Sequence, residues 1–480
     1  MYLDEIFKKA PHFEIKQLSC DSRMPMNDAI FFCLDGPFYD GHDFYKEAIK
    51  NGAKVIIYES QIDTNFNAIF IKVKNVTNVL IKIAKIFYSN PTSNLTSYVV
   101  SGCYGKTITT YIIDKLLNCF EKSAYISQRG IYDGNDYRTT SFRTLSIIET
   151  LKVARKMVKM GVKSAIFESS VQSLSYKKMD VVDADCFIYT TTGVESSEYK
   201  ELNREYQEEL FSYLSRLDSK TKLIINRDDI LFDSLSRNSE NTYISYGTNV
   251  DSDFRITSVQ LLPNETKFSI VVNNNKYNIS TKLLGFSNVY NLTAAICALS
   301  LRYSIDEIIK HIDIVEQIDG CFYSVNEGQN YKVIIDGASN YETIKYVYQY
   351  AKAITPDDKR IISVLPINYL DNSTMLQEIM NLSEDTVDLL VITAGDTYGK
   401  DLTPLIEEAR SYIQKRKYVI IEDRETAISV SIDNANSDDT VLLLGKGEEK
   451  YIYHVLGKSS YAGDKKVATN AIRRRENEAF

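Results

Sequence analysis

Short apolar runs alternate with amphipathic stretches along most of the chain. In residues 1–90 the runs AIFFCL, AKVIIYE and NAIFIKV alternate with helical stretches such as DFYKEAIKNGA. Buried parallel strands read as short apolar runs, whereas amphipathic helices repeat their apolar positions every three or four residues. The pattern therefore predicts a small α/β unit that closes near the turn sequence YSNPTSN.

The alternation is longer in residues 95–230. Here SYVVSG, KSAYIS, KSAIFESS, DCFIYTTT and KLIINRDD are candidate buried strands between helical patterns, which indicates a mostly parallel sheet. Residues 243–283 differ, because TYISYG, DFRITSVQL, TKFSIVV and KYNISTKLL are joined by Asn-rich turns. That pattern is typical of a small antiparallel sheet.

A third alternation begins at Tyr331, with the runs YKVIIDG, RIISVLP, DLLVITAG, YVIIED and TVLLLGKG. It predicts a Rossmann-like domain. A length of 480 residues also favours roughly three domains. We therefore expect an α/β protein with domains at residues 1–92, 93–318 and 319–480, and a phosphate-binding loop in the central one.

Composition and charge narrow the class of protein. A net charge of −8 gives no electrostatic reason to expect a nucleic-acid partner. No run approaches 18 apolar residues, and the N-terminus lacks an apolar segment of signal-peptide length, so we expect a cytoplasmic protein without membrane insertion. Seven cysteines without CxxC spacing indicate neither a zinc site nor a disulfide framework.

The stretch VVSGCYGKTITT, residues 99–110, contains the trio Gly105-Lys106-Thr107. A strand followed directly by a helix offers free N–H groups and a helix dipole to an anion. Lys106 would reach the terminal phosphates of a nucleotide, and Thr107 would ligate Mg²⁺. The general phosphate-loop pattern also needs a glycine where Val100 stands, so an ordinary strand–turn–helix remains the alternative reading of this stretch alone.

Ten segments together carry a resemblance to a known family. They are residues 20–59 (CDSRMPMNDAIFFCLDGPFYDGHDFYKEAIKNGAKVIIYE), NPTSNLTSYVVSGCYGKTITT, MGVKSAIFESS, IINRDD, ISYG, LLGFSNVYNLTAA, VIIDGAS, EDRETAI, LLLGKGEE and GDKKVATNAI. In this order they resemble the Mur ligases, most closely the branch that adds the third residue to the UDP-N-acetylmuramoyl dipeptide of peptidoglycan.

The resemblance implies a fold and an activity. Residues 1–92 would bind the UDP-sugar, residues 93–318 would form a parallel-sheet ATP-binding domain, and residues 319–480 would form the C-terminal ligase domain. The implied reaction joins an amino acid to a UDP-N-acetylmuramoyl peptide in cell-wall synthesis, using ATP and Mg²⁺. A carboxylate attacks the γ-phosphate and the amine then attacks the acyl phosphate, so charge develops on the transferring phosphoryl group.

The resemblance also assigns roles to single residues. Lys106, Glu168 and Glu195 would be catalytic, and Thr107 and Glu168 would hold the metal. Nucleotide contacts would come from Gly102, Gly105, Lys106, Thr107, Asn291 and Asp336. Substrate contacts would come from Ser22, Arg23, Gly41, His42 and Ser170. Asp43, before FYKEAIK, is in addition a good candidate for a helix N-cap.

The chain departs from the family pattern at several positions. Tyr104 stands for an asparagine, Gln172, Ser196, Ser339 and Glu448 stand for histidines, Cys321 for an arginine, and Leu210 for a lysine that the family carbamylates. The diaminopimelate signature Asp-Asn-Pro-Arg has become AGDTYGK at residues 394–400. Leu210 is expected to pack with Tyr206, Phe211 and Leu214 on one helix face. We therefore expect at most one Mg²⁺, because Ser196 and Leu210 offer no ligand for a second.

Two functional readings remain open at this point. One is a working Mur-type ligase with diverged metal and amino-acid sites. The other is a catalytically impaired homologue that binds a nucleotide or UDP-sugar as a scaffold or regulator. Removal of one positioned charged donor lowers the catalytic rate by about two to three orders of magnitude. Because several such positions differ in this chain, the impaired homologue remains an alternative. The sequence assigns no oligomeric state.

Overall fold

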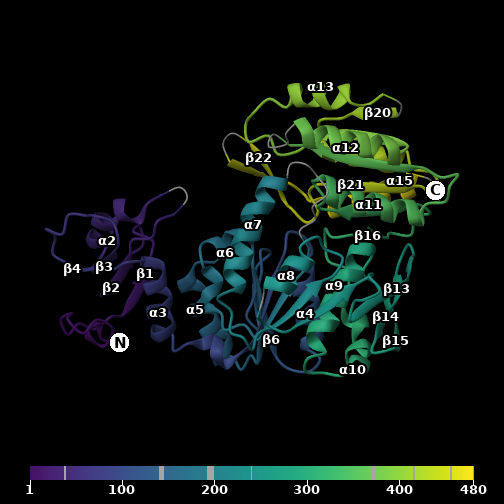
Figure 1. Ribbon diagram of the computed structural model, residues 1–480. Coiled ribbons are helices and arrows are strands. Elements are labelled where there is room, and N and C mark those ends of the chain that lie inside the picture. Colours follow the sequence, from purple (N-terminus) through teal and green to yellow (C-terminus); the bar gives the residue numbers. More distant parts are fainter. Residues whose placement is uncertain are drawn as a thin grey trace.

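The computed structural model describes the chain except for residues 37–38, 140–144, 192–198, 239, 369–372, 415–416, 455–456 and 479–480. Three large sheets, of 4, 11 and 6 strands, follow one another along the sequence. In Figure 1 the N-terminal unit (purple) stands to one side of the middle unit (blue to green), and the C-terminal unit (green to yellow) lies above the middle unit. The predicted three-part α/β architecture is confirmed.

The N-terminal unit is a small parallel sheet in the order β1-β2-β3-β4. Its elements are α1 (Leu3–Ile6), β1 (Gln17–Ser19), β2 (Ala29–Phe32), η1 (Gly41–Asp43), α2 (Tyr45–Lys50), β3 (Ala53–Tyr58), β4 (Ile69–Lys72), α3 (Val76–Phe87) and η2 (Pro91–Asn94). Helix α3 packs against the middle unit, where Lys85 Nζ donates to Asp183 Oδ1 at 2.7 Å.

The middle unit is built on one 11-stranded sheet. Its first half comprises β5 (Thr96–Ser101), α4 (Lys106–Leu117), β6 (Ser123–Ile126), β7 (Ile131–Tyr132), β8 (Tyr137–Arg138), α5 (Ile147–Lys159), β9 (Ser164–Glu168), α6 (Val171–Ser175), η3 (Lys178–Val181) and β10 (Cys186–Tyr189). Its second half comprises α7 (Tyr199–Leu214), β11 (Lys222–Asn226), α8 (Phe232–Asn238), β12 (Tyr243–Gly247), β13 (Phe254–Leu261), β14 (Thr266–Val272), β15 (Asn275–Thr281), α9 (Phe286–Leu299), α10 (Ile305–Lys310) and η4 (Ile312–Ile314).

Strand β5 lies at the centre of this sheet, between parallel neighbours β10 and β9. Its inner residues are apolar on both faces because helices cover both sides, as a parallel sheet requires. The separate antiparallel sheet expected over residues 243–283 is not formed. Strand β12 instead pairs in parallel with β11 and β13, so the antiparallel strands β13–β15 extend the main sheet.

The C-terminal unit has the strand order β16-β17-β21-β18-β19-β20, parallel except for β16. Its elements are β16 (Tyr323–Val325), β17 (Lys332–Asp336), α11 (Tyr341–Ile354), β18 (Ile361–Ile367), α12 (Ser373–Thr386), β19 (Leu389–Ala394), α13 (Thr403–Ser411), β20 (Lys417–Ile420), α14 (Arg424–Asp433), β21 (Thr440–Leu444), β22 (Tyr451–His454), β23 (Gly457–Ser460) and α15 (Asp464–Glu478). This is the Rossmann-like alternation that the sequence predicts.

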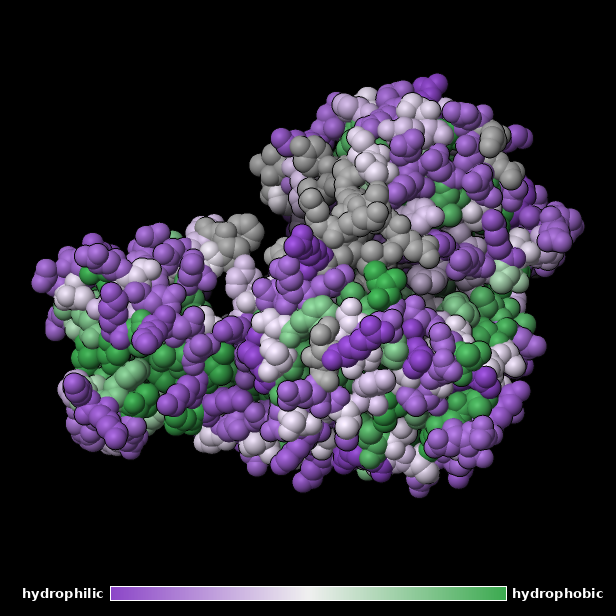
Figure 2. Space-filling model, in the orientation of Figure 1, coloured by the Kyte–Doolittle hydropathy of each residue, from purple (hydrophilic) through white to green (hydrophobic). Residues whose placement is uncertain are grey.

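The domain boundaries expected after residues 92 and 318 fall between these sheets, and as boundaries they stay predictions. Figure 2 shows a deep notch between the N-terminal unit and the rest of the molecule. Across the described residues, no helix combines the length and the apolar character that a membrane span needs. The site residues predicted from the sequence are distributed over all three units.

Candidate active site

The predicted phosphate loop joins the end of β5 to the first turn of α4. Gly105 is the N-cap of α4 and adopts the left-handed conformation, with φ +79°. A Cβ there would lie 2.3 Å from Asn291 Oδ1, and at Gly102 it would lie 2.1 Å from Thr190 Oγ1. Both positions therefore require glycine, and the loop is held tightly between two neighbouring elements.

Lys106 is the first residue of α4, where free backbone N–H groups and the helix dipole attract anions. Its Nζ donates to the carbonyl oxygen of Cys103 at 3.0 Å, so the ammonium curls back over the loop. Among the described residues Lys106 has no ion-pair partner. Within the part of the chain that the structure describes, the loop thus presents the Lys106 ammonium without a paired carboxylate.

Thr107 and Glu168 meet beside this cation. Thr107 Oγ1 donates to Glu168 Oε1 at 2.8 Å, and the backbone N–H of Gln128 donates to Glu168 Oε2 at 3.0 Å. Glu168 ends strand β9, next to β5, and is only 6% exposed. Parallel neighbours place these groups at the same carboxyl edge of the sheet, where ligands bind in α/β proteins.

Helix α9 forms the second side of the loop. Asn291 is buried, accepts from Thr109 Oγ1 at 3.4 Å and donates to Asn288 Oδ1 at 3.0 Å. One residue earlier, the Tyr290 hydroxyl donates to Asp228 Oδ2 at 2.7 Å. Asn291 therefore touches the phosphate loop itself, and its predicted nucleotide contact would be made from that position.

The C-terminal unit closes a cleft of about 540 Å³ over the loop. Its wall includes Asp336, at the end of β17, which accepts from the N–H groups of Phe322 at 2.7 Å and Ala338 at 2.8 Å. Burial raises the pKa of the Asp336 carboxyl to about 6, although the two backbone donors act in the opposite direction. The cleft brings together Gly105, Lys106, Thr107, Asn291 and Asp336, all predicted nucleotide contacts.

The substrate residues predicted in the N-terminal unit lie on two loops that follow parallel strands β1 and β2. Ser22 Oγ bonds to Glu47, and Arg23 forms a two-pronged ion pair with Asp21 at 2.8 Å while its side chain stays exposed. Gly41 needs to be glycine, because a Cβ would lie 2.7 Å from the backbone nitrogen of Leu34. These loops share one edge of the sheet.

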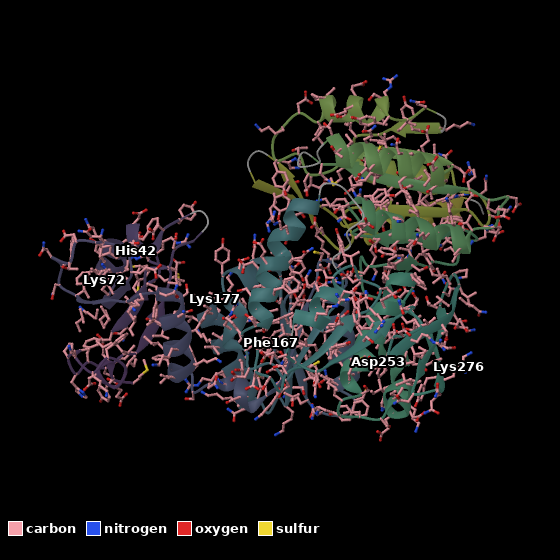
Figure 3. All side chains as sticks on the ribbon, in the orientation of Figure 1. His42, Lys72, Phe167, Lys177, Asp253 and Lys276 are labelled. Atoms are coloured by element: carbon pink, nitrogen blue, oxygen red, sulfur yellow. The ribbon has the colours of Figure 1, made fainter. Side chains whose placement is uncertain are left out.

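His42 is buried and both of its ring nitrogens are used inside the protein. Nε2 accepts from the N–H groups of Glu59 at 3.1 Å and Ser60 at 3.2 Å, so the proton sits on Nδ1, which contacts Asp40 Oδ1 at 2.5 Å. Figure 3 shows His42 in the N-terminal unit, well away from Phe167 of β9. The ring braces the loop, which leaves it no polar atom for a ligand.

Three further expectations have different outcomes. Asp43 is not an N-cap, because it lies within η1. Helix α2 begins after Phe44, which makes no side-chain capping bond, and η1 is capped by Asp40, which accepts from His42 N. Ser170 caps the five-residue helix α6 by accepting from Ser173 N at 3.3 Å. Glu195, together with Ser196, lies outside the described residues.

Leu210 is fully buried in the hydrophobic core on α7, as predicted, with Tyr206 and Leu214, while Phe211 packs against the same core. Tyr206 is also buried and its hydroxyl lies 3.3 Å from Ser101 Oγ, below the phosphate loop. This part of α7 thus places the apolar side chain of Leu210 in the core and the Tyr206 hydroxyl beside Ser101.

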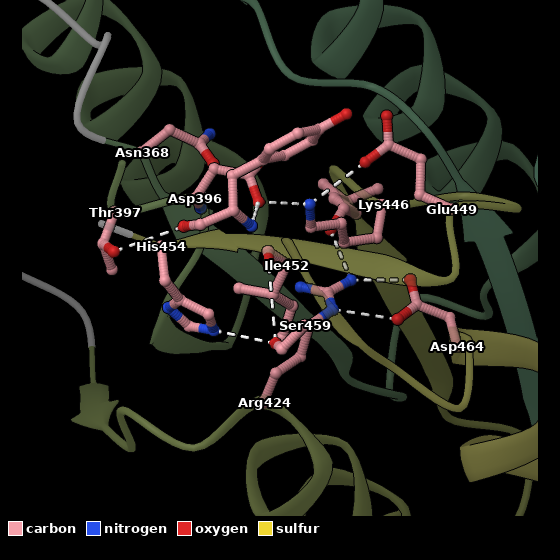
Figure 4. A network of polar contacts seen from close by, with 12 residues as sticks. Asn368, Asp396, Thr397, Arg424, Lys446, Glu449, Ile452, His454, Ser459 and Asp464 are labelled. Atoms are coloured by element: carbon pink, nitrogen blue, oxygen red, sulfur yellow. Dashed lines mark hydrogen bonds and ion pairs between the residues drawn. The ribbon is translucent and has the colours of Figure 1, made fainter. Parts of the chain in front are cut away.

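The AGDTYGK segment forms part of a polar network in the C-terminal unit, shown in Figure 4. The buried Lys446 Nζ lies 2.5 Å from Asp396 Oδ1 and 3.0 Å from Glu449 Oε2. Asp396 also accepts from the N–H of Tyr453 at 3.0 Å. The segment that replaces the branch's Asp-Asn-Pro-Arg signature thus contributes Asp396 to an ion-pair network around Lys446.

One cation of the cleft was not foreseen from the sequence. Arg129, in the turn after β6, forms an ion pair with Glu448 and donates to the carbonyl oxygen of Asp319 at 3.0 Å. Its guanidinium also lies 3.9 Å from Cys321 Sγ. Cys321 and Glu448 are two of the positions that depart from the family pattern, so a middle-unit arginine stands where both departures meet.

The donor set at the head of the cleft fits a nucleotide with a divalent cation. Carboxylate and hydroxyl oxygens are the ligands that Mg²⁺ prefers, and Glu168 with Thr107 supplies one of each. The described residues contain no group of three or more His, Cys, Asp and Glu side chains arranged for a metal. Such a cation would therefore depend on phosphate oxygens and water for its remaining ligands.

Comparison with known proteins agrees with this geometry. The Mur ligase middle domain matches residues 100–299, the glutamate ligase domain of Mur ligases matches residues 322–447, and the catalytic domain of the Mur ligase family matches residues 14–88. The chain belongs to the Mur ligase family. Each match falls within one of the three structural units.

Relatives of full length point the same way. The UDP-N-acetylmuramoyl-L-alanyl-D-glutamate–2,6-diaminopimelate ligase of Bacillus cereus is 27% identical over 473 residues, which is 97% of this chain and 95% of the relative. A solved structure of a ligase with that same name has a TM-score of 0.72 at 17% identity, with 99% of both chains covered. MurF from Thermotoga maritima in complex with ADP has a TM-score of 0.63 at 15% identity, covering 97% of this chain and 99% of that one.

Proposed function

We propose that this Mur ligase family member is an ATP-dependent amide ligase, which joins an amino acid to a UDP-N-acetylmuramoyl peptide in peptidoglycan synthesis. The observation that carries the proposal is the hydrogen bond of 2.8 Å from Thr107 Oγ1 to the buried Glu168, beside Lys106 at the head of an interdomain cleft. The relative from Bacillus cereus is named for a ligase reaction of this class.

The phosphate loop would bind the nucleotide. The N–H groups at the start of α4 and the Lys106 ammonium favour the terminal phosphates, where negative charge develops during phosphoryl transfer. Thr107 and Glu168 would hold Mg²⁺, which when bound neutralises charge on the phosphate oxygens. Asn291 and Asp336 would contact the nucleotide from the two opposite sides of the cleft.

The UDP-sugar peptide would contact the N-terminal loops that carry Ser22, Arg23 and Gly41, with His42 holding those loops in place. Arg23 is the exposed cation of the group, and its guanidinium can pair with an anionic group of the substrate. Ser170, beside Glu168, would lie between these loops and the cleft and contact the peptide part of the substrate.

The incoming amino acid would reach the C-terminal unit near residues 394–400. Asp396 and Glu449 flank Lys446 there, so this region offers carboxylates where the resembled branch has an arginine. An amino acid that lacks a second free carboxylate suits such a surface better than diaminopimelate does. The diverged part of the function would therefore be the choice of amine.

Two separate calorimetric titrations test the proposal, one with ATP and Mg²⁺ and one with UDP-N-acetylmuramoyl dipeptide. Binding of both supports a ligase, because the reaction needs both in one molecule. Binding of the sugar nucleotide alone would contradict the proposal and favour a scaffold. Ligation itself is then assayed with the twenty common amino acids and diaminopimelate as amine donors.

A further inference from the structure

The side chain of Arg129, in the middle unit, contacts both the connection around Asp319 and the C-terminal unit. This connection, residues 318–322, is called the hinge below. Arg129 donates to the carbonyl oxygen of Asp319, at 3.0 Å, and forms an ion pair with Glu448. Asp319 lies in the connection between the sheets of the two units, and Glu448 lies in the loop after β21. Arg129 thus contacts both the connection and the C-terminal unit.

We propose that the Arg129–Glu448 ion pair is an electrostatic latch that holds the C-terminal unit closed over the cleft. The latch is a positioning device, and it acts on the equilibrium between closed and open arrangements before any ligand binds. It concerns the resting protein, so it does not depend on turnover.

The middle-unit end of the latch is fixed in position. The carbonyl oxygen of Arg129 accepts from the Tyr137 hydroxyl at 2.6 Å, and Ser127 N donates to Gly130 O at 2.9 Å to close the turn. The neighbouring Gln128 N donates to Glu168 at 3.0 Å. The guanidinium is therefore carried by a rigid turn that is bonded to the candidate metal ligand itself.

The C-terminal end is equally fixed. Two residues before Glu448, Lys446 is buried between Asp396 and Glu449, and this network ties the loop to strand β19 and the β22–β23 hairpin (Figure 4). A Cβ on Gly320 would lie 2.2 Å from Glu448 N, so the loop also packs directly on the hinge. The position of Glu448 is therefore coupled to that of the C-terminal unit through this network.

The burial of the pair suits a reversible contact. The side chain of Arg129 is 21% exposed and that of Glu448 is 45% exposed, so solvent reaches the pair when the units separate. Ion pairs of this exposure are worth little each and are screened by salt. The pair therefore biases the joint by about twofold to fivefold, which is enough to shift a balanced equilibrium without locking it.

Other contacts that the structure describes across the joint include uncharged ones. The Tyr350 hydroxyl donates to Leu262 O at 2.9 Å, and Phe322 packs against Gly285, where a Cβ would lie 2.7 Å from its ring. These contacts respond weakly to ionic strength. A salt dependence of closure that disappears when Arg129 is replaced is thus the signature of the Arg129–Glu448 pair.

A charge swap in the ligand-free protein tests the latch. The variants are Arg129→Glu, Glu448→Arg and the two combined, with Lys465→Ala as control. Lys465 pairs with Asp319 at 2.8 Å within the C-terminal side of the joint, so its removal disturbs the same hinge residue without touching the latch. Small-angle X-ray scattering reports the overall opening, and amide hydrogen exchange of residues 318–322 reports the hinge.

Each single reversal is expected to increase the radius of gyration and to speed hinge exchange by about fivefold, and the double variant should return both toward wild type. About 0.5 M NaCl should open the wild type but leave Arg129→Glu unchanged. Equal values for all variants, or a double variant more open than either single one, would overturn the proposal. Absence of ligase turnover would leave these readouts intact, so the latch and the proposed function fail separately.

Discussion

The two walls of the interdomain cleft differ in the cations they carry. The middle-unit wall presents Lys106 with Thr107 and Glu168, held within 3.0 Å of one another or of the loop backbone. The C-terminal wall presents acidic or neutral groups, Asp336 and Cys321 among them, and Glu448 stands just beyond. Within the described residues at this joint, the guanidinium that meets the C-terminal wall is supplied by the middle unit.

This contrast shows which half of the site is constrained by chemistry. Phosphate and Mg²⁺ impose a strand–loop–helix with a lysine, a hydroxyl and a carboxylate, and those groups are retained in the middle unit. Under the proposed function the C-terminal wall would position the nucleotide and receive the amine, tasks that allow more than one arrangement of charges. A cation at the joint can therefore be supplied by either unit, and in this chain Arg129 of the middle unit supplies it.

The largest expected effect comes from removing Lys106, the lysine of the phosphate loop. Lys106→Ala should weaken ATP binding by more than about a hundredfold, because the loop keeps its N–H groups but loses the charge aimed at the phosphates. Calorimetry with ATP and Mg²⁺ measures this. Lys115→Ala, on the same helix, is the matched control. Equal affinity of wild type and Lys106→Ala would make Lys106 a structural residue.

A smaller effect is expected at the metal position. Glu168→Gln keeps the shape of the side chain but removes its charge, so Mg²⁺ should no longer strengthen ATP binding, a loss of about a hundredfold. ATP affinity in EDTA should stay close to that of wild type. Titrations with and without Mg²⁺ separate the two cases, and a Mg²⁺ response that survives in the variant would remove Glu168 from the metal site.

The middle and C-terminal units each contain a buried carboxyl whose pKa burial raises to about 6, Asp114 on α4 and Asp336 in the cleft. A raised folded-state pKa means that the folded protein binds the proton more readily than the unfolded chain, whose Asp pKa is near 3.8. The stability contributed by protonation therefore appears as pH falls through about 6, and it is lost as pH rises above that value.

The variant Asp114→Asn tests this pH dependence of stability on helix α4. The asparagine oxygen can still accept from Ser123 Oγ and Asn118 Nδ2, which lie 2.7 and 3.1 Å from Asp114 Oδ1. The variant should be more stable than wild type by about 2 kcal/mol near neutral pH, and the difference should shrink toward zero near pH 4. Thermal unfolding across this range measures it. A difference that does not change with pH would contradict the burial argument.

The smallest effect is expected on helix α9. Tyr290→Phe removes the hydroxyl that donates to Asp228, but Asp228 Oδ2 also accepts from the Thr248 hydroxyl at 2.9 Å. The carboxylate therefore stays satisfied, and ATP affinity should change by less than about threefold. Calorimetry measures this too. A loss of affinity as large as that of Lys106→Ala would show that the Tyr290 hydroxyl on α9 is as important for ATP binding as the phosphate loop.

Much of this contrast could be predicted from the sequence, and the reasons are local. Apolar runs and glycines specify β5, the loop and α4, and a strand-end carboxylate such as Glu168 falls at the same sheet edge as Thr107. The antiparallel strands β13–β15 were predicted correctly as hairpins but not as part of the main sheet. Which edge a strand joins depends on β12, and local pattern does not carry that information.

The C-terminal wall was less predictable because its partners are far apart in sequence. Arg129 and Glu448 are 319 positions apart, since 448 − 129 = 319, and Arg129 reads as one more exposed charge in a turn. His42 shows a different limit. The resemblance implied a substrate contact there, and the structural role of the ring, whose nitrogens contact Asp40, Glu59 and Ser60, could not be read from the sequence.

The most direct test of the ligase function is a coupled product assay. Protein, ATP, Mg²⁺, UDP-N-acetylmuramoyl dipeptide and an amino-acid mixture are incubated, and ADP and the sugar nucleotides are followed by mass spectrometry. The ligase proposal predicts ADP together with a product whose mass equals dipeptide plus one amino acid minus water, and the loss of both products in Lys106→Ala. No such product from a wild type that binds both ligands in calorimetry would contradict it.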